Sequence, residues 1–384
     1  MRFCSIFNQL LQLFSRQEFE RAVTDTHAER HARGFTCWGQ FVAMLFCHLG
    51  RAHSLREIVG GLASCEGRLA HLGITVPKRS TLAYANAHRP WQLYQTVFYQ
   101  VLARCQAVAP SKKFRFKNKL LSLDATIIDL CAEMFPWATF RRTKGAVKLH
   151  CTLDHDGYLP TVMVITEGKR RETPVAREQR FAPGTILVFD RGYLKVEWFA
   201  ELTAAGVYFV TRPRPTTRYR IVARRPVPQH RHILADHEIQ LRGRLSCRQY
   251  PDRLRRVVLQ TPEGERLEFL TNHLTLGAST VARIYQDRWQ IELFFKALKQ
   301  NLRVKTFVGT SANALHIQIW TALIALVLLK FLRFQARFGW SLSNLVALLR
   351  MNLFVYRDLW AWLHEPFTAP PLPPEPVQQA LALA

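Results

Sequence analysis

Residues 120–131 read LLSLDATIIDLC, a largely apolar run with two acidic side chains, of which Asp124 lies near its centre. Such a run, bounded by polar and basic segments, predicts a central strand that is buried on both faces. Strand alternation places Asp124 on the same face as Thr126 and Ile128, and sends Asp129 to the opposite face. Because a carboxylate buried without a partner is costly, Asp124 is a candidate site residue.

A second apolar strand also ends in a carboxylate. Residues 184–193 read GTILVFDRGY, so Asp190 lies at the carboxyl end of the strand, where open α/β sheets bind ligands. Between the two acidic strands, residues 146–166 predict a pair of strands joined by an Asp-Gly turn. A helix is expected from Thr173, and Glu172 before it is interpreted only as a favourable charge at the helix N-terminus.

A third acid lies in a predicted helix, YQDRWQIELFFKALKQN, at residues 285–301. At 100° per residue one polar stripe of this helix contains Tyr285, Arg288, Glu292 and Lys299. An apolar stripe lies beside it and predicts the packed face. Taken alone, the polar stripe is better explained by an ordinary exposed helix in which Glu292 pairs with Arg288 and Lys296, each pair contributing about 0.2–0.5 kcal/mol.

The net charge narrows the class of partner. The 384 residues include 53 Lys and Arg against 28 Asp and Glu, which leaves +25 at pH 7. A surface this positive favours a polyanion, with nucleic acid as the leading candidate and an anionic membrane as the alternative. The apolar segment 314–334 contains His316, Gln318 and Lys330, so it is interpreted as a buried core helix and not as a span of about 20 apolar residues.

Cysteine usage and the first residues predict a cytoplasmic protein. The eight cysteines include no C-x-x-C pair, which argues against a zinc ribbon and a redox motif and favours free thiols in a reducing compartment. The first twenty residues contain Asn8 and Gln9 within their apolar stretch and show no small-residue cleavage site, so no signal peptide is expected.

Residues 1–112 predict a helical domain that binds DNA. Ser54 and Glu57 have the spacing of a capping box. A short helix is expected around residues 65–73, and residues 74–90 then predict a turn and a basic helix, as in a helix-turn-helix. The side chains expected to face the DNA groove are Lys78, Arg79, Ser80, Thr81 and Asn86.

The remaining chain divides into three segments that differ in predicted secondary structure and composition. Residues 113–310 predict a catalytic α/β domain, interrupted at about 207–272 by short arginine-rich strands that we interpret as an all-β insertion. Residues 311–364 are helical, and residues 365–384 form a Pro-rich tail. Two acids on strands and one on a helix, in a strongly basic protein, suggest a two-metal phosphoryl-transfer site.

The motifs LDATIID and VFDRGY, together with the spacing Y-x2-R-x3-E-x6-K, resemble the DDE transposases of bacterial insertion sequences. The resembling branch is the insertion-sequence-four family, known by its Tyr-Arg-Glu-Lys signature. This resemblance covers most of the chain. It implies a ribonuclease H-like catalytic core, an all-β insertion between the second Asp and the Glu, and an all-helical N-terminal DNA-binding domain.

The resemblance also implies roles for individual residues. The expected ligands of two Mg²⁺ ions, for which Mn²⁺ substitutes, are Asp124, Asp190 and Glu292. The side chains expected to grip the phosphates of the transposon end are Tyr285, Arg288 and Lys299. Trp289 is expected either to stack on an unpaired base or to pack against the β insertion. The implied partners are terminal inverted repeats and target DNA, bound by a homodimer on paired ends.

Two other functions fit the same residues. A DNA-binding regulator with structural carboxylates would bind DNA without cutting it, although burying two aspartates without metal is then costly. A ribonuclease H-like nuclease without strand transfer would share the cleavage chemistry. Only a joined DNA product separates this nuclease from a transposase.

Overall fold

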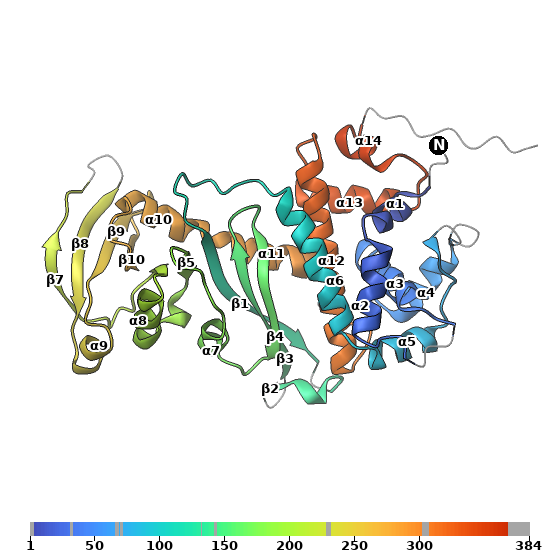
Figure 1. Cartoon of the computed structure of the whole chain (residues 1–384), viewed down its shortest axis with the longest axis horizontal. Helices are drawn as coiled ribbons and strands as arrows, with labels where there is room; N and C mark the ends of the chain where they lie inside the picture. The colour runs from blue at the N-terminus through green and yellow to red at the C-terminus, as the bar shows by residue number, and fades with distance from the viewer. Residues whose placement is uncertain are drawn as a thin grey trace, which may run out of the picture. The chain divides into compact units, whose positions relative to one another are not determined.

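The chain folds into two compact units, which we call unit 1 and unit 2. The computed structural model describes residues 4–30, 34–65, 69, 72–131, 133–141, 144–227, 232–301 and 307–367. Unit 1 comprises Met1–Val108 and Gln300–Ala384, and unit 2 comprises Ala109–Lys299. Figure 1 shows helices throughout unit 1 and a long sheet with helices against it in unit 2.

Unit 1 is helical in its described part. Its helices are α1 Ile6–Gln12, α2 Arg16–Asp25, α3 Cys37–Leu49, α4 Leu55–Ala63, α5 Arg79–His88, α6 Gln92–Ala107, α12 Ala312–Gln335, α13 Leu342–Asn352 and α14 Leu359–His364. The capping box predicted for α4 is confirmed, because Ser54 Oγ accepts the Glu57 N–H at 3.1 Å and Glu57 Oε2 accepts the His53 N–H at 2.8 Å. Most of the short helix predicted around residues 65–73, and all but the first residues of the Pro-rich tail, lie outside the described residues.

Helix α12 is the core of unit 1. It packs against α3, α5 and α6, and nearly all of its side chains from Ala314 to Leu329 are buried. Its polar groups find partners there, since the Thr321 hydroxyl lies 3.0 Å from His48 Nε2 and Gln318 Oε1 accepts the Val308 N–H at 2.9 Å. The helix is long and apolar enough to cross a membrane, but 83% of its most apolar window is buried inside the protein, as predicted for a core helix.

Unit 2 is built on one ten-stranded sheet. Its strands are β1 Leu120–Leu130, β2 Thr139–Arg141, β3 Lys144–Asp154, β4 Leu159–Glu167, β5 Ile186–Phe189, β6 Tyr208–Thr211, β7 Tyr219–Arg224, β8 Ile233–Leu241, β9 Leu254–Gln260 and β10 Arg266–Thr271. The strand order is β2-β3-β1-β5-β6-β10-β9-β8-β7, with β4 also paired to β3. Strands β1, β5 and β6 run parallel to one another, whereas β3 is antiparallel to β1. The chain is therefore an α/β protein with a large mixed sheet.

Helices cover both faces of this sheet. They are α7 Glu172–Arg177, α8 Val196–Ala204, α9 Arg244–Gln249, α10 Ala278–Asp287 and α11 Trp289–Asn301, with 3-10 turns η2 Pro136–Ala138 and η3 Arg191–Tyr193. Odd-numbered residues of β1 and β5, such as Leu123 and Phe189, pack in the cluster that contains α8. Even-numbered residues, such as Leu120 and Val188, pack in the cluster that contains α10. Alternation along the strands thus turns every even-numbered side chain of β1 towards α10.

The segment expected as an all-β insertion differs from that expectation in two respects. Its first strand, β6, pairs directly with β5, and β10, β9, β8 and β7 continue the same sheet outward. Residues 244–249 form a helix, α9, so the segment is not purely β. A strand edge carries unpaired N–H and C=O groups, and extending the existing sheet satisfies them for each strand but the last.

The single helix expected over residues 285–301 is interrupted. Helix α10 ends at Asp287, Arg288 forms the junction, and α11 starts at Trp289. The Arg288 N–H bonds to the Tyr285 carbonyl at 3.2 Å, three residues back, which tightens the turn locally. Arg288 keeps right-handed helical dihedrals, with φ −52° and ψ −30°, so the Arg288 and Glu292 side chains still meet.

Candidate active site

Three alternate residues of β1 face the α10–α11 junction. Ser122, Asp124 and Thr126 share the even-numbered face of the strand. Arg288 Nη1 lies 3.4 Å from Asp124 Oδ2, and Lys299 Nζ donates to Thr126 Oγ1 at 2.6 Å. The face predicted for Asp124 and Thr126 is therefore the face that meets the polar side chains of the two helices.

Arg288 connects two of the three predicted acids. Its Nη2 donates to Glu292 Oε1 at 2.7 Å while its Nη1 pairs with Asp124. Its guanidinium carbon also lies 5.5 Å from the centre of the Tyr285 ring. Burial acts to lower the pKa of Arg288, but Tyr285, Glu292 and Asp124 outweigh it and the pKa is raised. Arg288 therefore stays charged, and its Nε is buried without a hydrogen-bond partner.

Asp190 follows β5, the parallel neighbour of β1, and begins the 3-10 turn η3. Its Oδ1 accepts the Gly192 N–H at 2.7 Å. A Cβ atom added to Gly192 would lie 3.0 Å from Asp190 Oδ1 and 3.2 Å from Glu172 Oε2. Glycine at this position therefore allows the Asp190 and Glu172 carboxylates to approach the same point. The sequence interpretation of Glu172 as only a helix-end charge is incomplete, because the fold brings it beside Asp190.

The carboxylates influence one another electrostatically. The pKa of Asp124 is raised to about 7, with burial as the largest cause and the charges of Asp190 and Glu172 adding to it, while the Ala125 N–H and Arg288 act to lower it. Burial also raises the pKa of Tyr193, and the charges of Glu172, Asp124 and Asp190 add to that effect. These shifts indicate a shared, partly dehydrated cluster of acids where β5 ends beside the middle of β1, which we call the acidic pocket.

The acids do not form a closed metal cage in this structure. In the described ranges, no three acidic, histidine or cysteine side chains lie close enough together to hold a metal ion. Arg288 pairs with both Asp124 and Glu292, so its positive charge compensates the two carboxylates. The donor set still fits a hard cation such as Mg²⁺, because every candidate ligand is a carboxylate oxygen.

A buried hydrogen-bonded chain ties β1 to the end of α10, and the sequence analysis missed it. Ser122 Oγ lies 2.7 Å from His155 Nε2, and His155 Nδ1 lies 2.7 Å from Asp287 Oδ2. The Tyr158 hydroxyl donates to the same carboxylate at 3.1 Å. Ser122 and His155 are almost completely buried, so this chain fastens the end of α10, next to Arg288, to β1 out of reach of solvent.

The remaining side chains expected to contact DNA near the acids are Lys299, Tyr285 and Trp289. The Lys299 ammonium also donates to the Ile127 carbonyl at 2.7 Å, so it joins α11 to β1. Tyr285 is half-buried against Phe269, with ring centres 5.2 Å apart, and burial raises its pKa. Trp289 is 56% exposed, so more than half of its side chain is accessible to solvent.

The predicted DNA-facing residues of unit 1 lie mostly on the exposed side of α5. Lys78, Arg79 and Ser80 are exposed and Thr81 is half-buried. Asn86 is the exception, because it is buried and its Oδ1 accepts a hydrogen bond from Gln40 Nε2 at 2.8 Å. It lies four residues after Leu82 on the face that packs towards α3, so the expectation that it faces DNA is wrong.

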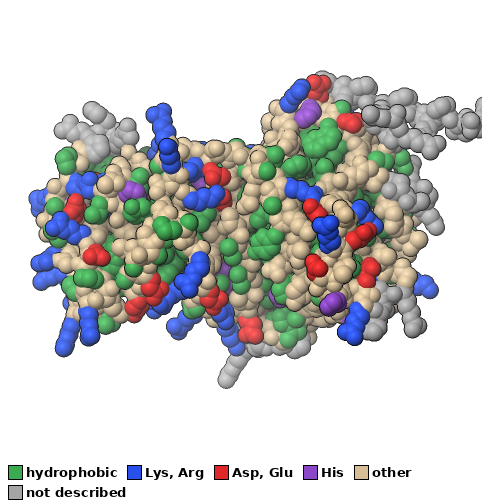
Figure 2. Space-filling model, in the orientation of Figure 1, with side chains coloured by type: hydrophobic (Ala, Val, Ile, Leu, Met, Phe, Trp, Pro, Cys, Tyr) green, Lys and Arg blue, Asp and Glu red, His purple; other side chains and the backbone are tan. Residues whose placement is uncertain are grey.

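Basic side chains gather at one end of unit 2. Figure 2 shows Lys and Arg around the end that carries β7, β8 and α9. The exposed members in this region are Arg218, Arg220, Arg224, Arg242, Arg244, Arg248 and Arg253. Such a surface favours a polyanion by displacing its counterions.

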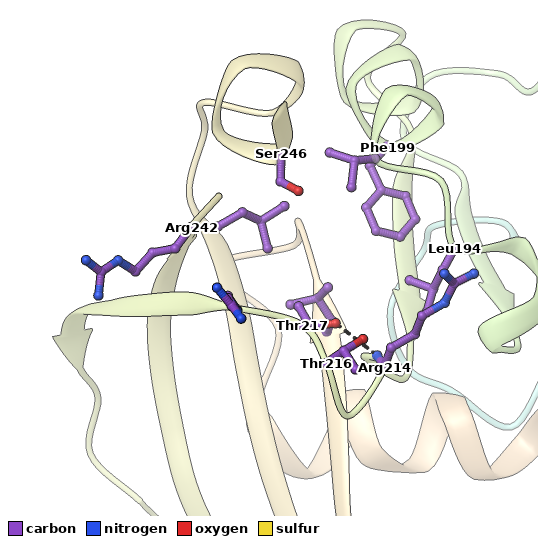
Figure 3. Close-up of a pocket in the computed structure, with 11 residues that line it drawn as sticks. Leu194, Phe199, Arg214, Thr216, Thr217, Arg242 and Ser246 are labelled. Carbon is purple, nitrogen blue, oxygen red and sulfur yellow. Dashed lines mark hydrogen bonds between the residues drawn. The ribbon is translucent and has the colours of Figure 1, made fainter. Parts of the chain in front are cut away.

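A separate hollow of about 310 Å³ lies between α8, α9 and the β6–β7 turn (Figure 3). Leu194 and Phe199 contribute apolar atoms to it, and Figure 3 shows Arg242 pointing away from it. The Arg214 N–H donates to Thr217 Oγ1 at 3.0 Å and closes the turn at its edge. None of the four carboxylates lines this hollow, so it is distinct from the acidic pocket.

Comparisons with known proteins agree with this geometry. The family model "Transposase DDE domain" matches residues 115–328, and the model "Domain of unknown function (DUF4372)" matches residues 4–75. A putative transposase of Sinorhizobium fredii is 27% identical over 289 residues, which cover 74% of this chain and 80% of the relative. A probable transposase for insertion sequence element IS5377 of Geobacillus stearothermophilus is 30% identical over 260 residues, covering 67% and 68%.

Among solved structures, a piggyBac transposase synaptic complex with hairpin DNA is similar with a TM-score of 0.48 and 11% identity. The alignment covers 96% of this chain and 82% of the piggyBac chain.

Proposed function

The chain belongs to the transposase DDE domain family, and from this premise we propose that it cuts the ends of an insertion sequence and joins them to target DNA. Membership of the family makes it a DNA transposase, a DNA-processing enzyme. The proposal adds the reaction, its residues and its metal. The observation that carries it is the convergence of Asp124 and Glu292 on Arg288, next to Asp190 at the end of the neighbouring parallel strand.

The strand pattern supports a ribonuclease H-like core. Strands β4, β3, β1, β5 and β6 follow one another across the sheet, with β1, β5 and β6 parallel and β3 antiparallel. Asp124 and Asp190 lie on the adjacent parallel strands β1 and β5, where α/β sheets bind ligands. The α10–α11 junction then brings Glu292 to the same face.

Asp124, Asp190 and Glu292 would hold Mg²⁺, with Mn²⁺ as a substitute. When bound, two such ions stabilise the attacking and leaving oxygens of phosphoryl transfer. The protein's own contribution is to collect the carboxylates on one face of the sheet and to limit the access of water to Asp124, whose pKa of about 7 reports its burial. The site thus favours a cationic partner at neutral pH.

Basic and aromatic residues beside the acids would hold the DNA. We assign Arg288, Tyr285 and Lys299 to the phosphates near the scissile bond, which matches the Tyr-Arg-Glu-Lys signature of the insertion-sequence-four family. The guanidinium of Arg288 has five N–H donors, more than its pairs with Asp124 and Glu292 use, so it has donors left for a phosphate oxygen. The exposed Trp289 ring is assigned to an unpaired base.

The proposed reaction has two steps. Water first attacks the phosphorus at the transposon end, the bond to the 3′ oxygen breaks, and a 3′-hydroxyl and a 5′-phosphate result. The 3′-hydroxyl then attacks a target phosphorus, the bond from that phosphorus to the target's own 3′ oxygen breaks, and the target strand leaves with a free 3′-hydroxyl as the new phosphodiester forms. Arg79, Ser80 and Thr81 on the exposed side of α5 would contact the terminal repeat. We propose that the enzyme works as a homodimer on paired ends in the bacterial cytoplasm.

A cleavage assay tests the proposal directly. Purified full-length protein is incubated with Mg²⁺ and double-stranded DNA that carries both gene-flanking ends. Glu292→Gln and Asp190→Asn should each lower the cleavage rate by at least about 100-fold, because each removes a proposed metal ligand. The matched control, Glu178→Gln, changes an exposed carboxylate that pairs with Arg170 and should keep the rate.

Three outcomes separate the candidate functions. A joined product in the same reaction supports the transposase mechanism. Cleavage without a joined product would indicate a nuclease. Binding of the end DNA without cleavage in Mg²⁺ or Mn²⁺ would indicate a regulator and would overturn the proposed reaction.

A further inference from the structure

Glu172 is an acidic residue near the proposed metal ligands Asp124, Asp190 and Glu292, and it has no role in the reaction proposed above. It is the first residue of α7, and its side chain is directed to the loop that follows β5. Its Oε2 and Asp190 Oδ1 both lie close to the position that a Cβ of residue 192 would occupy, at 3.2 Å and 3.0 Å. The two carboxylates therefore approach one another across a glycine that leaves the space between them open.

The hydrogen bonds of Glu172 involve Oε1 and leave Oε2, the oxygen nearer Gly192, without a donor among the described residues. Oε1 faces Lys148 Nζ at 3.4 Å, and the same ammonium donates to the Arg170 carbonyl at 3.0 Å. Oε2 accepts no hydrogen bond from the residues that the structure describes, and Asp190 Oδ1 accepts only the Gly192 N–H among them. Both carboxylate oxygens are thus directed to the same point beside Gly192, where a cation would find two oxygen donors.

The charge of Glu172 also acts on Asp124. Asp124 interacts electrostatically with both Asp190 and Glu172. Glu292, by contrast, pairs with Arg288, which lies between it and Asp124. Glu292 is the acid named by the family signature, yet Arg288 separates it from Asp124. Within the described ranges, Glu172 is the carboxylate that lies near both aspartates with no arginine between.

We propose that Glu172 is a fourth carboxylate of the site and ligates a divalent cation together with Asp190. The inference rests on the proposed function, since it concerns the metal that the DDE family implies. The donor atoms fit, because both are carboxylate oxygens and Mg²⁺ and Mn²⁺ favour oxygen ligands. Lys148 holds the other oxygen of Glu172 and orients the carboxylate towards Asp190.

Metal binding, measured without DNA, tests the role of Glu172. Mn²⁺ is titrated into the full-length protein and free Mn²⁺ is followed by electron paramagnetic resonance. Glu172→Gln should weaken binding by at least about tenfold, as should Asp190→Asn. Glu178→Gln, the matched change of an exposed carboxylate, should bind as the wild type does. Glu172→Asp retains a carboxylate on a shorter side chain and should weaken binding less than Glu172→Gln.

A control variant separates ligation from a structural role. If Glu172 acted only by holding Lys148, then Lys148→Met would weaken Mn²⁺ binding as much as Glu172→Gln does. The proposal expects Lys148→Met to change binding by less than about threefold, because the metal-facing oxygens remain. Far-ultraviolet circular dichroism and thermal melts of each variant check that the fold is retained.

The outcomes distinguish this inference from the proposed function. Wild-type affinity in folded Glu172→Gln, together with weakened binding in Asp190→Asn, would overturn the role of Glu172 and leave the transposase site intact. Equal weakening by Lys148→Met and Glu172→Gln would also overturn it. Wild-type protein that shows no Mn²⁺ binding sensitive to Asp190→Asn would overturn both the inference and the metal-dependent reaction.

Discussion

At the scale of single residues, Asp124 carries the largest electrostatic cost in the site. Its side chain lies among apolar strand residues and is 19% exposed. Arg288 compensates part of its charge, but burial and the two neighbouring carboxylates outweigh this and raise the pKa of Asp124 to about 7. A buried carboxylate with a raised pKa lowers the stability of the folded protein when it is ionised, and a bound cation would offset this cost.

Replacing Asp124 with Asn should stabilise the metal-free protein at high pH. Folding raises the pKa of this acid from 3.8 to about 7, so the folded chain binds more protons than the unfolded chain between these values. The contribution of Asp124 to stability therefore falls as the pH rises from about 4 to 7 and stays low above that range. In EDTA at pH 8, Asp124→Asn should raise the melting temperature by about 2–4 °C for each kcal/mol recovered.

The same comparison has an internal control. At pH 4 the wild type and Asp124→Asn should melt within about 1 °C of one another, because the acid is then largely protonated in the folded state. Asp129→Asn changes an exposed carboxylate on the same strand and should leave the pH profile as it is. A melting temperature at pH 8 that is lower for Asp124→Asn than for the wild type would contradict the assignment of an unfavourable charge.

At the scale of elements, the site depends on how β1 meets the α10–α11 junction. Ser122, through His155, reaches Asp287 at the end of α10, and Lys299 of α11 donates to Thr126. These contacts flank the pair formed by Asp124 and Arg288. The strand and the helices are thus fastened on both sides of the site, which restricts the movement of Arg288 and Glu292 relative to Asp124.

Breaking the buried chain should loosen this junction. Asp287→Asn removes the anionic acceptor that pairs with buried His155, so we expect the free energy of unfolding in urea to fall by about 1–3 kcal/mol. DNA cleavage should slow as well, because Arg288 follows Asp287 directly. Tyr158→Phe removes one hydrogen bond to the same carboxylate and should cost only about 0.5–1.5 kcal/mol. Equal stability of Asp287→Asn and the wild type would show that the chain does not hold the junction.

At the scale of the whole molecule, two units have separate cores. The core of unit 1 surrounds α12, and that of unit 2 lies on the two faces of the ten-stranded sheet. The described members of the acidic pocket, from Asp124 to Glu292, all belong to unit 2. The predicted DNA-reading residues of α5 belong to unit 1. The predicted DNA-reading residues and the acidic residues therefore belong to different units. We expect each unit, with its own core, to unfold as a separate cooperative unit.

Calorimetry of a unit 1 variant checks this separation. Leu326 on α12 is fully buried, and Leu326→Ala should destabilise unit 1 by about 2–5 kcal/mol. We expect two thermal transitions in the wild type and a downward shift of only one of them in the variant. Met351→Ala, which changes a side chain that is 78% exposed on α13, should shift neither transition. A single transition that moves as a whole would show that the two units unfold together.

The central strands of unit 2 and their acids were predictable from local sequence patterns alone. Apolar runs predicted β1 and β5 because a strand buried on both faces excludes polar residues, so Asp124 and Asp190 stood out. Period-two alternation also gave the face of Asp124, which the structure shows turned towards Arg288. The motifs around these acids and around Glu292 indicated a transposase, a family that the match over residues 115–328 shows. The roles of the individual residues remain predictions.

Contacts between residues that are distant in the sequence became visible only in the folded chain. Glu172 begins the short helix α7, and only the fold of the loop through Gly192 brings it beside Asp190. His155 and Asp287 are 132 residues apart, and no local pattern records their hydrogen bond. The same reason explains the buried Asn86, the break at Arg288 and the arginine between Asp124 and Glu292. Local periodicity reports which face a side chain occupies, whereas its partner depends on long-range packing of the whole sheet and its helices.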